Sequence, residues 1–186
     1  DSLVKWKAPA SITISGYDWA IEFAEVFAEG GFDIVVANPP FVRMELIKPI
    51  KPMLRTNFPH VHDERTDLYI YFYARSHQLL RQTGIGCFIS SNKWLRAGYG
   101  EKLRQLLLDS QAFHLVVDFG ELPVFQAAAT FPAIFLWQKQ PRDKTPTIWA
   151  TVKDLHSCYD EGVLEHVSRI AHVVPASQFE IGRAHV

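Results

Sequence analysis

Residues 32–41 read FDIVVANPPF, a strand pattern that stops abruptly. The first six residues are apolar except for one aspartate, which is typical of a short strand in the core of a domain. The strand must end at Asn38, because Pro39 and Pro40 have fixed φ angles and lack the N–H group that pairs strands. An aromatic ring, Phe41, follows directly. A core strand that ends in an amide, two prolines and a ring predicts a corner that binds a ligand.

Helical and strand patterns alternate on both sides of this corner. Strand, helix, strand, helix, strand favours right-handed crossovers and a parallel sheet. The short link between the last two strands predicts that the final strand adds antiparallel, as an edge hairpin. We therefore expect an α/β fold, a partial Rossmann-like sheet with an antiparallel edge hairpin. Helices are predicted over residues 18–29, 67–82 and 98–109, and strands over residues 32–37, 85–90, 113–119 and 131–138.

Composition limits the class of protein. The chain has 186 residues, of which 48% are hydrophobic and 21% charged, so a sizeable core can form. The net charge of −1 gives no overall sign of nucleic-acid binding, and any such surface must be local. No apolar run approaches the roughly 18–20 residues that cross a bilayer. Cys87 and Cys158 lie far apart without a CxxC motif, which fits a reducing cytoplasm.

The residues of the corner suit one kind of chemistry. Ligands bind outside the carboxyl ends of strands in an open parallel sheet, where Asn38 is expected to lie. The side-chain oxygen of Asn38 and the carbonyl of Pro39 can accept both hydrogens of an aromatic amine and orient it toward an electrophilic methyl group. A base that carries such an amine must leave the duplex and stack on a ring such as Phe41. The alternative is that the segment only terminates a strand.

The same segment resembles the Asn-Pro-Pro-aromatic motif of amino-methyltransferases that use S-adenosylmethionine. Two later stretches, RTDLYIYFYARSHQLLRQTGIGCFISSNKWLRAGYGEKLRQLL and FGELPVFQAAATFPAIFLWQK, are similar to adenine-specific (N6) DNA methyltransferases of the TaqI-like group. They look closest to the methylase part of type IIG restriction–modification enzymes. The resemblance covers roughly residues 17–140 and implies a Rossmann-like methyltransferase sheet. It also implies methyl transfer from S-adenosylmethionine to the exocyclic amine of a flipped adenine in double-stranded DNA, in restriction–modification or phage defence.

The resemblance also assigns roles to single residues. Phe41 matches the aromatic residue that stacks on the flipped base, and Phe125 matches a second ring lining the base pocket. Phe72 matches a residue that packs on the adenine of the cofactor, which Asn38 also approaches. Core packing is the alternative for Phe72 and Phe125. The motif positions assigned to catalysis are Asn38, Pro39, Pro40 and Phe41.

Two basic stretches follow the predicted strands, and each carries four basic residues against one acidic residue. Both are expected to meet DNA phosphates beside the base pocket, with solvated surface as the alternative. His60, His62 and Asp63 lie close in sequence but lack a well-spaced further ligand, so no metal site is predicted. The predicted DNA-binding residues are Arg43, Lys48, Lys51, Lys93 and Arg96.

The chain departs from the family pattern in one respect, because no glycine-rich cofactor loop precedes the corner. We therefore expect residues 1–140 to be the C-terminal half of a catalytic domain that is inactive alone. It would need an upstream cofactor-loop region and a downstream target-recognition domain. Residues 141–179 are expected to form a linker and the start of a target-recognition region. Residues 180–186, EIGRAHV, back-translate into a sequence similar to a sequencing adapter and are interpreted as an artefact, a real polar tail being the alternative.

Two other functions stay open on the sequence. Asn-Pro-Pro-aromatic corners also serve methylation of RNA bases or of protein glutamine. A non-catalytic DNA-binding or specificity subunit would keep the fold without the cofactor loop. The basic loop after the corner, together with the DLY and NKWL stretches, favours DNA.

Overall fold

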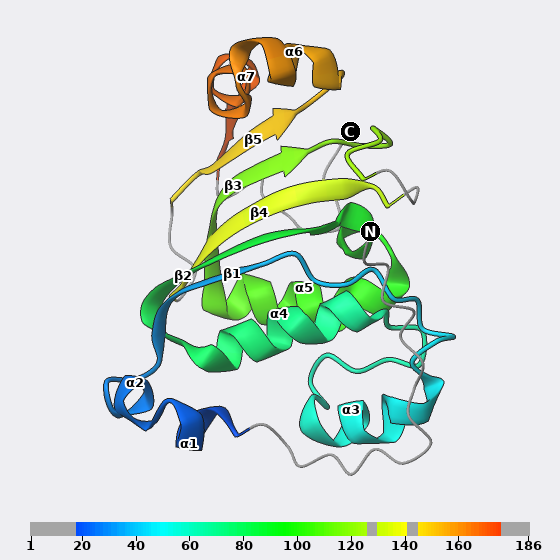
Figure 1. Cartoon of the computed structure of the whole chain (residues 1–186), viewed down its shortest axis with the longest axis vertical. Coiled ribbons are helices and arrows are strands. Elements are labelled where there is room, and N and C mark those ends of the chain that lie inside the picture. The colour runs from blue at the N-terminus through cyan, green and yellow to red at the C-terminus, as the bar shows by residue number, and fades with distance from the viewer. Residues whose placement is uncertain (1–17, 126–129, 141–144, 176–186) are drawn as a thin grey trace.

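The computed structural model describes residues 18–125, 130–140 and 145–175 (Figure 1). Its centre is a mixed six-stranded sheet with the strand order β1-β2-β4-β3-β5-β6, which confirms the predicted α/β class. β1 pairs parallel with β2 and β3 with β5, whereas β4 is antiparallel to β2 and β3 and β6 is antiparallel to β5. The strands are β1 (Phe32–Ala37), β2 (Leu80–Ser91), β3 (Gln111–Asp118), β4 (Pro132–Lys139), β5 (Thr147–Thr151) and β6 (His172–Val174).

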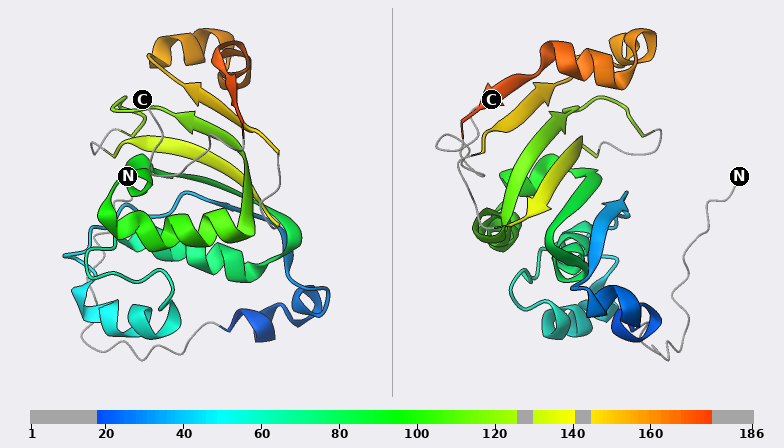
Figure 2. Two further views of the ribbon diagram at one scale, coloured as in Figure 1. Left: turned by 180° about the vertical axis from the view of Figure 1, so that it is seen from behind. Right: turned by 90° about the vertical axis from the view of Figure 1, so that its left-hand side faces the viewer.

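Two helices, α4 and α5, lie side by side against one face of this sheet (Figures 1 and 2). α6 and α7 pack near β5, at the end of the molecule opposite α3 (Figure 1). No helix among the described residues is long and apolar enough to cross a membrane. The α-helices are α1 (Trp19–Glu22), α2 (Ala24–Ala28), α3 (Lys51–Asn57), α4 (Leu68–Leu79), α5 (Glu101–Ser110), α6 (Leu155–Glu161) and α7 (Val163–Ile170). Short 3₁₀ turns span Lys48–Ile50, Asn92–Leu95 and Gly98–Gly100.

The helix predicted over residues 18–29 is broken at Phe23, whose φ of −127° and ψ of 46° lie outside the helical region. The break lets three aromatic side chains surround one ring. Trp19, Phe23 and Phe27 all place their rings within 6.0 Å, centroid to centroid, of Phe32 at the start of β1. Aromatic packing therefore overrides the local helical pattern.

The main core is an aromatic layer between the sheet and helices α4 and α5. Tyr73, Trp94, Phe135 and Trp137 are fully buried there. The hydroxyl of Tyr73 is 2.7 Å from Ser90 Oγ, so its polar atom is satisfied inside the core. A second, smaller core lies on the opposite face, where residues of β3 and β5 pack with α6 and α7. Helices α4 and α5 thus cover one face of the sheet, whereas α6 and α7 cover the opposite face near β5.

The predicted hairpin of residues 113–119 and 131–138 forms and is antiparallel, but its predicted place at the edge of the sheet is wrong. β4 lies in the interior, between β2 and β3. The reason is its apolar inward face, since Ala133, Phe135 and Trp137 are all fully buried. Gly86 of β2 permits this packing, because a Cβ there would lie 2.2 Å from the indole of Trp137.

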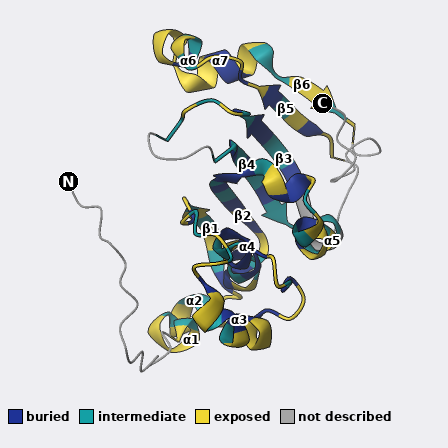
Figure 3. Ribbon diagram, turned by 90° about the vertical axis from the view of Figure 1, so that its right-hand side faces the viewer, coloured by how far each residue is buried: buried dark blue, intermediate teal, exposed yellow. Residues whose placement is uncertain are grey.

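The outer strands are β1 and β6. Along β1, Val35 and Ala37 pack on the main core, whereas Ile34 and Val36 on the other face are 61% and 72% exposed (Figure 3). At the far end, β5 and β6 extend the sheet past β3. The assignment of residues 141–179 to a linker and a target-recognition region stays a prediction. Residues 180–186 lie outside the described part of the chain.

Candidate active site

The carboxyl ends of β1, β2 and β3 lie at one edge of the sheet, because the strand pairings make all three run in the same direction. Side chains join two of these ends. Asn92, directly after β2, donates its amide Nδ2–H to Asp118 Oδ1 at the end of β3, over 2.8 Å. The backbone N–H of Gly120 donates to the same oxygen over 2.9 Å. Open α/β sheets bind ligands outside such ends.

The corner after β1 presents unpaired acceptors. Asn38 is exposed and Pro39 is buried. Within the described residues, neither the Asn38 side chain nor the Pro39 carbonyl has a hydrogen-bond partner. The carbonyl of Pro40 instead accepts from the N–H of Val42 over 2.9 Å, which closes a tight turn. Two oxygen acceptors are therefore free at the end of the strand.

The structure brings together two of the residues predicted to bind a base. The ring centroids of Phe41 and Phe125 are 5.6 Å apart, with an angle of 54° between the ring planes. Phe41 comes from the loop after β1 and Phe125 from the segment after β3. Both are half-buried, so neither ring lies wholly in the core. Two aromatic rings thus meet in the segments that follow β1 and β3, and one of them is three residues after Asn38.

The first turn of α4 holds the loop that follows the corner. The N–H of Leu68 donates to the carbonyl of Val42 over 3.0 Å, and the N–H of Met44 donates to Asp67 Oδ1 over 2.9 Å. Burial raises the pKa of the Asp67 carboxyl above its usual value. Asp67 was not singled out from the sequence. No sequence signal identifies its role, because an aspartate at the start of a helix is ordinarily an N-cap, whereas here it caps no N–H of its own helix.

Phe72 lies on α4 and is 37% exposed, although its neighbours Tyr71 and Tyr73 are buried. Its ring is therefore available to a ligand, and its proposed role in cofactor binding stays a prediction. Lys93 and Arg96, after β2, are both exposed. The ammonium of Lys93 lies 4.5 Å from the centroid of the Phe131 ring, a cation–π geometry.

The basic residues of the loop after the corner divide into two groups. Arg43 and Lys48 are exposed, whereas Lys51 is buried. A cleft of about 480 Å³, here called the basic cleft, contains Lys48 and Lys51 but not Arg43. Its lining residues are Met44, Lys48, Lys51, Pro52, Arg55, Glu64 and Arg65. The sequence analysis did not place Arg65 with the basic residues of this loop, because it lies further along the chain, in a stretch of mixed charge.

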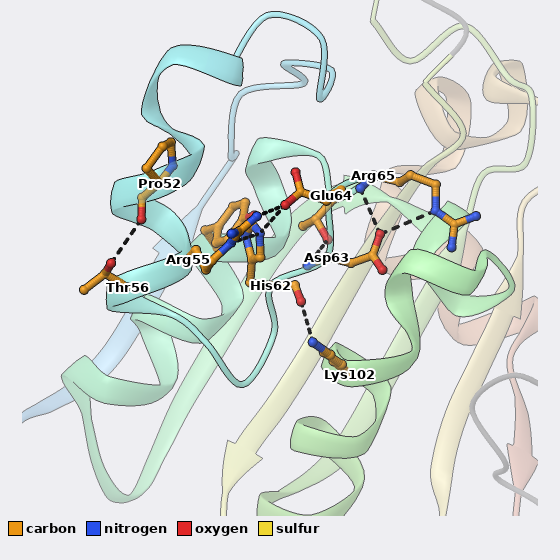
Figure 4. A network of polar contacts seen from close by, with 10 residues as sticks. Pro52, Arg55, Thr56, His62, Asp63, Glu64, Arg65 and Lys102 are labelled. Atoms are coloured by element: carbon orange, nitrogen blue, oxygen red, sulfur yellow. Dashed lines mark hydrogen bonds and ion pairs between the residues drawn. The ribbon is translucent and has the colours of Figure 1, made fainter.

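His62 and Asp63 belong to a polar network behind this cleft (Figure 4). His62 Nδ1 is 2.8 Å from the Tyr71 hydroxyl, and Asp63 Oδ1 accepts from the N–H of Arg65 over 2.8 Å. Burial, followed by the charge of Arg55, lowers the pKa of His62. The hydrogen bond from the Arg65 N–H lowers the pKa of Asp63. Within the described residues, no three His, Cys, Asp or Glu side chains are grouped to hold a metal ion.

Solved structures define the class of this fold. The structure is similar to a putative class I S-adenosylmethionine-dependent methyltransferase from Listeria monocytogenes, with a TM-score of 0.56 and 15% identity over 74% of this chain and 42% of that one. It is also similar to a modification subunit of a putative type I restriction enzyme from Vibrio vulnificus YJ016. There the TM-score is 0.58 and the identity 16%, over 80% of this chain and 34% of the other. The fold is that of an S-adenosylmethionine-dependent methyltransferase.

The chain belongs to the Eco57I restriction-modification methylase family, whose profile matches residues 3–125. Among curated proteins it is 34% identical, over 116 residues, to type II methyltransferase M.BstVI of Geobacillus stearothermophilus. That alignment covers 61% of this chain and 20% of the relative. The chain thus spans about a fifth of the length of the relatives it matches.

Fold and family imply S-adenosylmethionine as the cofactor. The described residues fit one part of such a site, through the exposed ring of Phe72 and the acceptors of the corner. Rossmann-like folds cradle the rest of a cofactor in a glycine-rich loop between a strand and a helix. No such loop is found in residues 18–125, 130–140 and 145–175, where Gly84 and Gly86 lie within β2 and Gly30 and Gly31 precede β1.

Proposed function

We propose that the protein containing this sequence transfers the methyl group of S-adenosylmethionine to the exocyclic amine of adenine in double-stranded DNA, as a site-specific enzyme of restriction–modification or phage defence. The observation that carries this proposal is the corner after β1. Two unpaired oxygen acceptors stand there at the carboxyl end of a strand, beside the Phe41 and Phe125 rings. The family supports DNA methylation in general, and the corner supports an amine as the acceptor of the methyl group.

The proposed chemistry needs positioning more than acid–base catalysis. The Asn38 side-chain oxygen and the Pro39 carbonyl accept the two hydrogens of the amine, which directs its lone pair outward. When bound, S-adenosylmethionine would supply an electrophilic methyl group. The two oxygens would hold the amine toward that group and stabilise the positive charge that the nitrogen gains before it releases a proton to water.

Phe41 and Phe125 are proposed to receive the flipped base. Stacking a base on an aromatic side chain contributes roughly 1–3 kcal/mol, which offsets part of the cost of leaving the duplex. At a centroid distance of 5.6 Å the two rings already touch each other. A base could therefore stack on the side of Phe41 that Phe125 leaves open, with Phe125 lining the same pocket. Phe72 is proposed to pack on the adenine of the cofactor, close to Asn38.

Arg43, Lys48, Lys51, Lys93 and Arg96 are proposed to contact DNA phosphates. We also propose that residues 1–186 alone lack activity, because no glycine-rich loop follows a strand in the described residues. An upstream cofactor-loop region and a downstream target-recognition domain would complete the enzyme. Both proposals are independent of which base is methylated.

The test uses the full-length protein, duplex DNA and S-adenosylmethionine with a labelled methyl group. Digestion of the DNA to nucleosides, followed by mass spectrometry, identifies the product. The expected product is N6-methyladenine. Methylated cytosine, RNA or protein glutamine would keep the chemistry of the corner and contradict the substrate. DNA binding without any methyl transfer would instead identify a non-catalytic specificity subunit.

A further inference from the structure

The basic cleft lies on the same loop as the proposed base-binding corner. Met44, which lines the cleft, is three residues after Phe41 and is fixed by its hydrogen bond to Asp67. Three residues span at most about 10 Å of chain. A ligand in the cleft would therefore lie beside a base held at Phe41.

The lining of the cleft is strongly basic. It contains four basic residues, Lys48, Lys51, Arg55 and Arg65, against one acidic residue, Glu64. Two of the four are already neutralised, since Arg55 is paired with Glu64 and Arg65 with Asp63 (Figure 4). The remaining positive charge comes from Lys48 and Lys51. Burial is the main reason why the pKa of His62 is lowered, and the charges of Arg55, Lys51 and Lys102 lower it further.

Lys51 is the unusual member of this group. It is 92% buried, whereas Lys48 is exposed. Within the described residues, the side chain of Lys51 has no hydrogen bond and no ion pair, whereas its backbone N–H donates to the carbonyl of Lys48. Its ammonium is nevertheless not one of the buried polar atoms that lack a partner, so the apolar stem is buried while the nitrogen opens into the cleft. A cation that faces a cleft without a counter-charge is suited to bind an anion there.

We propose that the basic cleft binds one phosphodiester group of the DNA backbone, next to the flipped nucleotide, with Lys51 as the main contact. The position next to the target rests on the proposed function. A phosphate fits because it offers several acceptor oxygens and full negative charge to Lys51, Lys48 and the adjoining guanidinium groups. Since phosphates along one strand follow each other at about 3.4 Å of rise, the bound group lies within about three nucleotides of the target base.

The first experiment replaces Lys51 by Met in the full-length protein, which keeps the apolar stem and removes the charge. The thermal midpoint should stay nearly the same, because the apolar stem is kept and the lost ammonium contacts no described residue. Binding to duplex DNA should weaken, and the slope of log Kd against log salt should fall by about 0.9, the value for one phosphate. Between 50 and 200 mM salt, wild type should therefore lose about 3.5-fold more affinity than Lys51→Met.

The matched controls separate this site from general charge. Lys51→Arg keeps the cation and should keep the slope. Arg81→Met removes a partly exposed cation at the start of β2, at the edge of the sheet opposite the carboxyl ends of β1 and β2, and should leave both affinity and slope unchanged. If Arg81→Met had the same effect as Lys51→Met, the contribution of the cleft would be only overall charge and the proposal would be wrong.

A second experiment identifies the phosphate. Single neutral methylphosphonates are placed along the target strand, and binding is measured for each duplex. Wild type should lose affinity at one position within about three nucleotides of the target, and Lys51→Met should be insensitive at that position alone. The same profile for both proteins would overturn the proposal. Binding of inorganic phosphate that depends on Lys51, with unchanged DNA binding, would also overturn it and indicate a site for free phosphate.

Failure of the proposed function gives a different result. If wild type methylated no adenine but the Lys51→Met and methylphosphonate effects held, the backbone site would stand and the assigned reaction would fall.

Discussion

Replacing Asn38 by Ala in the full-length protein separates the chemistry of the corner from its structure. Asn38 is exposed and lies after the last residue of β1, and its side chain makes no hydrogen bond with any described residue. Its loss should therefore change the free energy of unfolding by no more than about 0.5 kcal/mol. The proposed transition state loses one of two oriented acceptors, because the Pro39 carbonyl remains. Losing one such hydrogen bond costs about 2.7–4 kcal/mol, or a factor of 10²–10³ in rate.

The assay is single-turnover methyl transfer to duplex DNA, with binding of S-adenosylmethionine and thermal unfolding measured on the same samples. Asn57→Ala is the matched control, since Asn57 is also exposed but lies at the end of α3. It should react at the wild-type rate. Asn38→Asp tests the nature of the acceptor, because it keeps an oxygen and adds a charge.

Two outcomes would refute this reasoning. A rate for Asn38→Ala within a few-fold of wild type would mean that the corner only terminates a strand. A large loss of stability together with the loss of rate would mean that Asn38 has a structural role that its exposure does not suggest.

Three further predictions concern the rings, the core and a histidine. Phe41→Ala should weaken extrusion of the target base, seen as reduced fluorescence of 2-aminopurine, by roughly 1–3 kcal/mol, while Phe41→Tyr retains it; equal flipping in Phe41→Ala would contradict stacking. Gly86→Ala should lower the free energy of unfolding in denaturant by about 1–3 kcal/mol or more, because the new Cβ would lie 2.2 Å from the buried ring of Trp137; a neutral effect would mean that the strand can shift. Burial, and then the charge of Lys139, lowers the pKa of His77 to about 4. The neutral form is thus favoured in the folded state, so this contribution to stability is complete above about pH 6.5 and is lost as the pH falls toward 4. His77→Gln should remove that dependence, and an NMR titration of His77 near 6.5 would disprove it.

Local patterns predicted those parts of the fold that depend on neighbours in sequence. The strand over residues 32–37, its end at Asn38, and the antiparallel hairpin all follow from apolar runs and proline positions. The interior place of β4 could not be predicted in this way, because it depends on the packing of Trp137 over Gly86, and these two residues lie far apart in the chain. The break at Phe23 has the same origin, since its ring packs on Phe32.

In the candidate site, too, the sequence predicted some residues, whereas features that depend on contacts between distant segments were missed. The motif indicated Phe41 and Phe125, and the structure brings their rings into contact. Their roles stay predictions, as do those of the remaining motif residues. The contact between Asp67 and Met44 and the isolation of Lys51 were invisible, because each depends on how a loop folds back on a helix. Charge in a sequence shows which residues are basic and not which of them lack a partner.

The attachment of α4 at both ends limits how the corner can move. Its first turn binds the loop after the corner through Asp67 and Leu68, and its last residue, Leu79, continues directly into β2. β2 is in turn hydrogen-bonded to β1 and β4 in the sheet. The helix is therefore held at both ends, by the loop after the corner and by the sheet, and no linker residue separates it from β2. Displacing α4 as a body would break strand pairs, whereas loosening its first turn breaks two hydrogen bonds, each with a net contribution of about 0.5–3 kcal/mol. Entry of a base would then depend on fraying of one helical turn rather than on movement of the helix as a body.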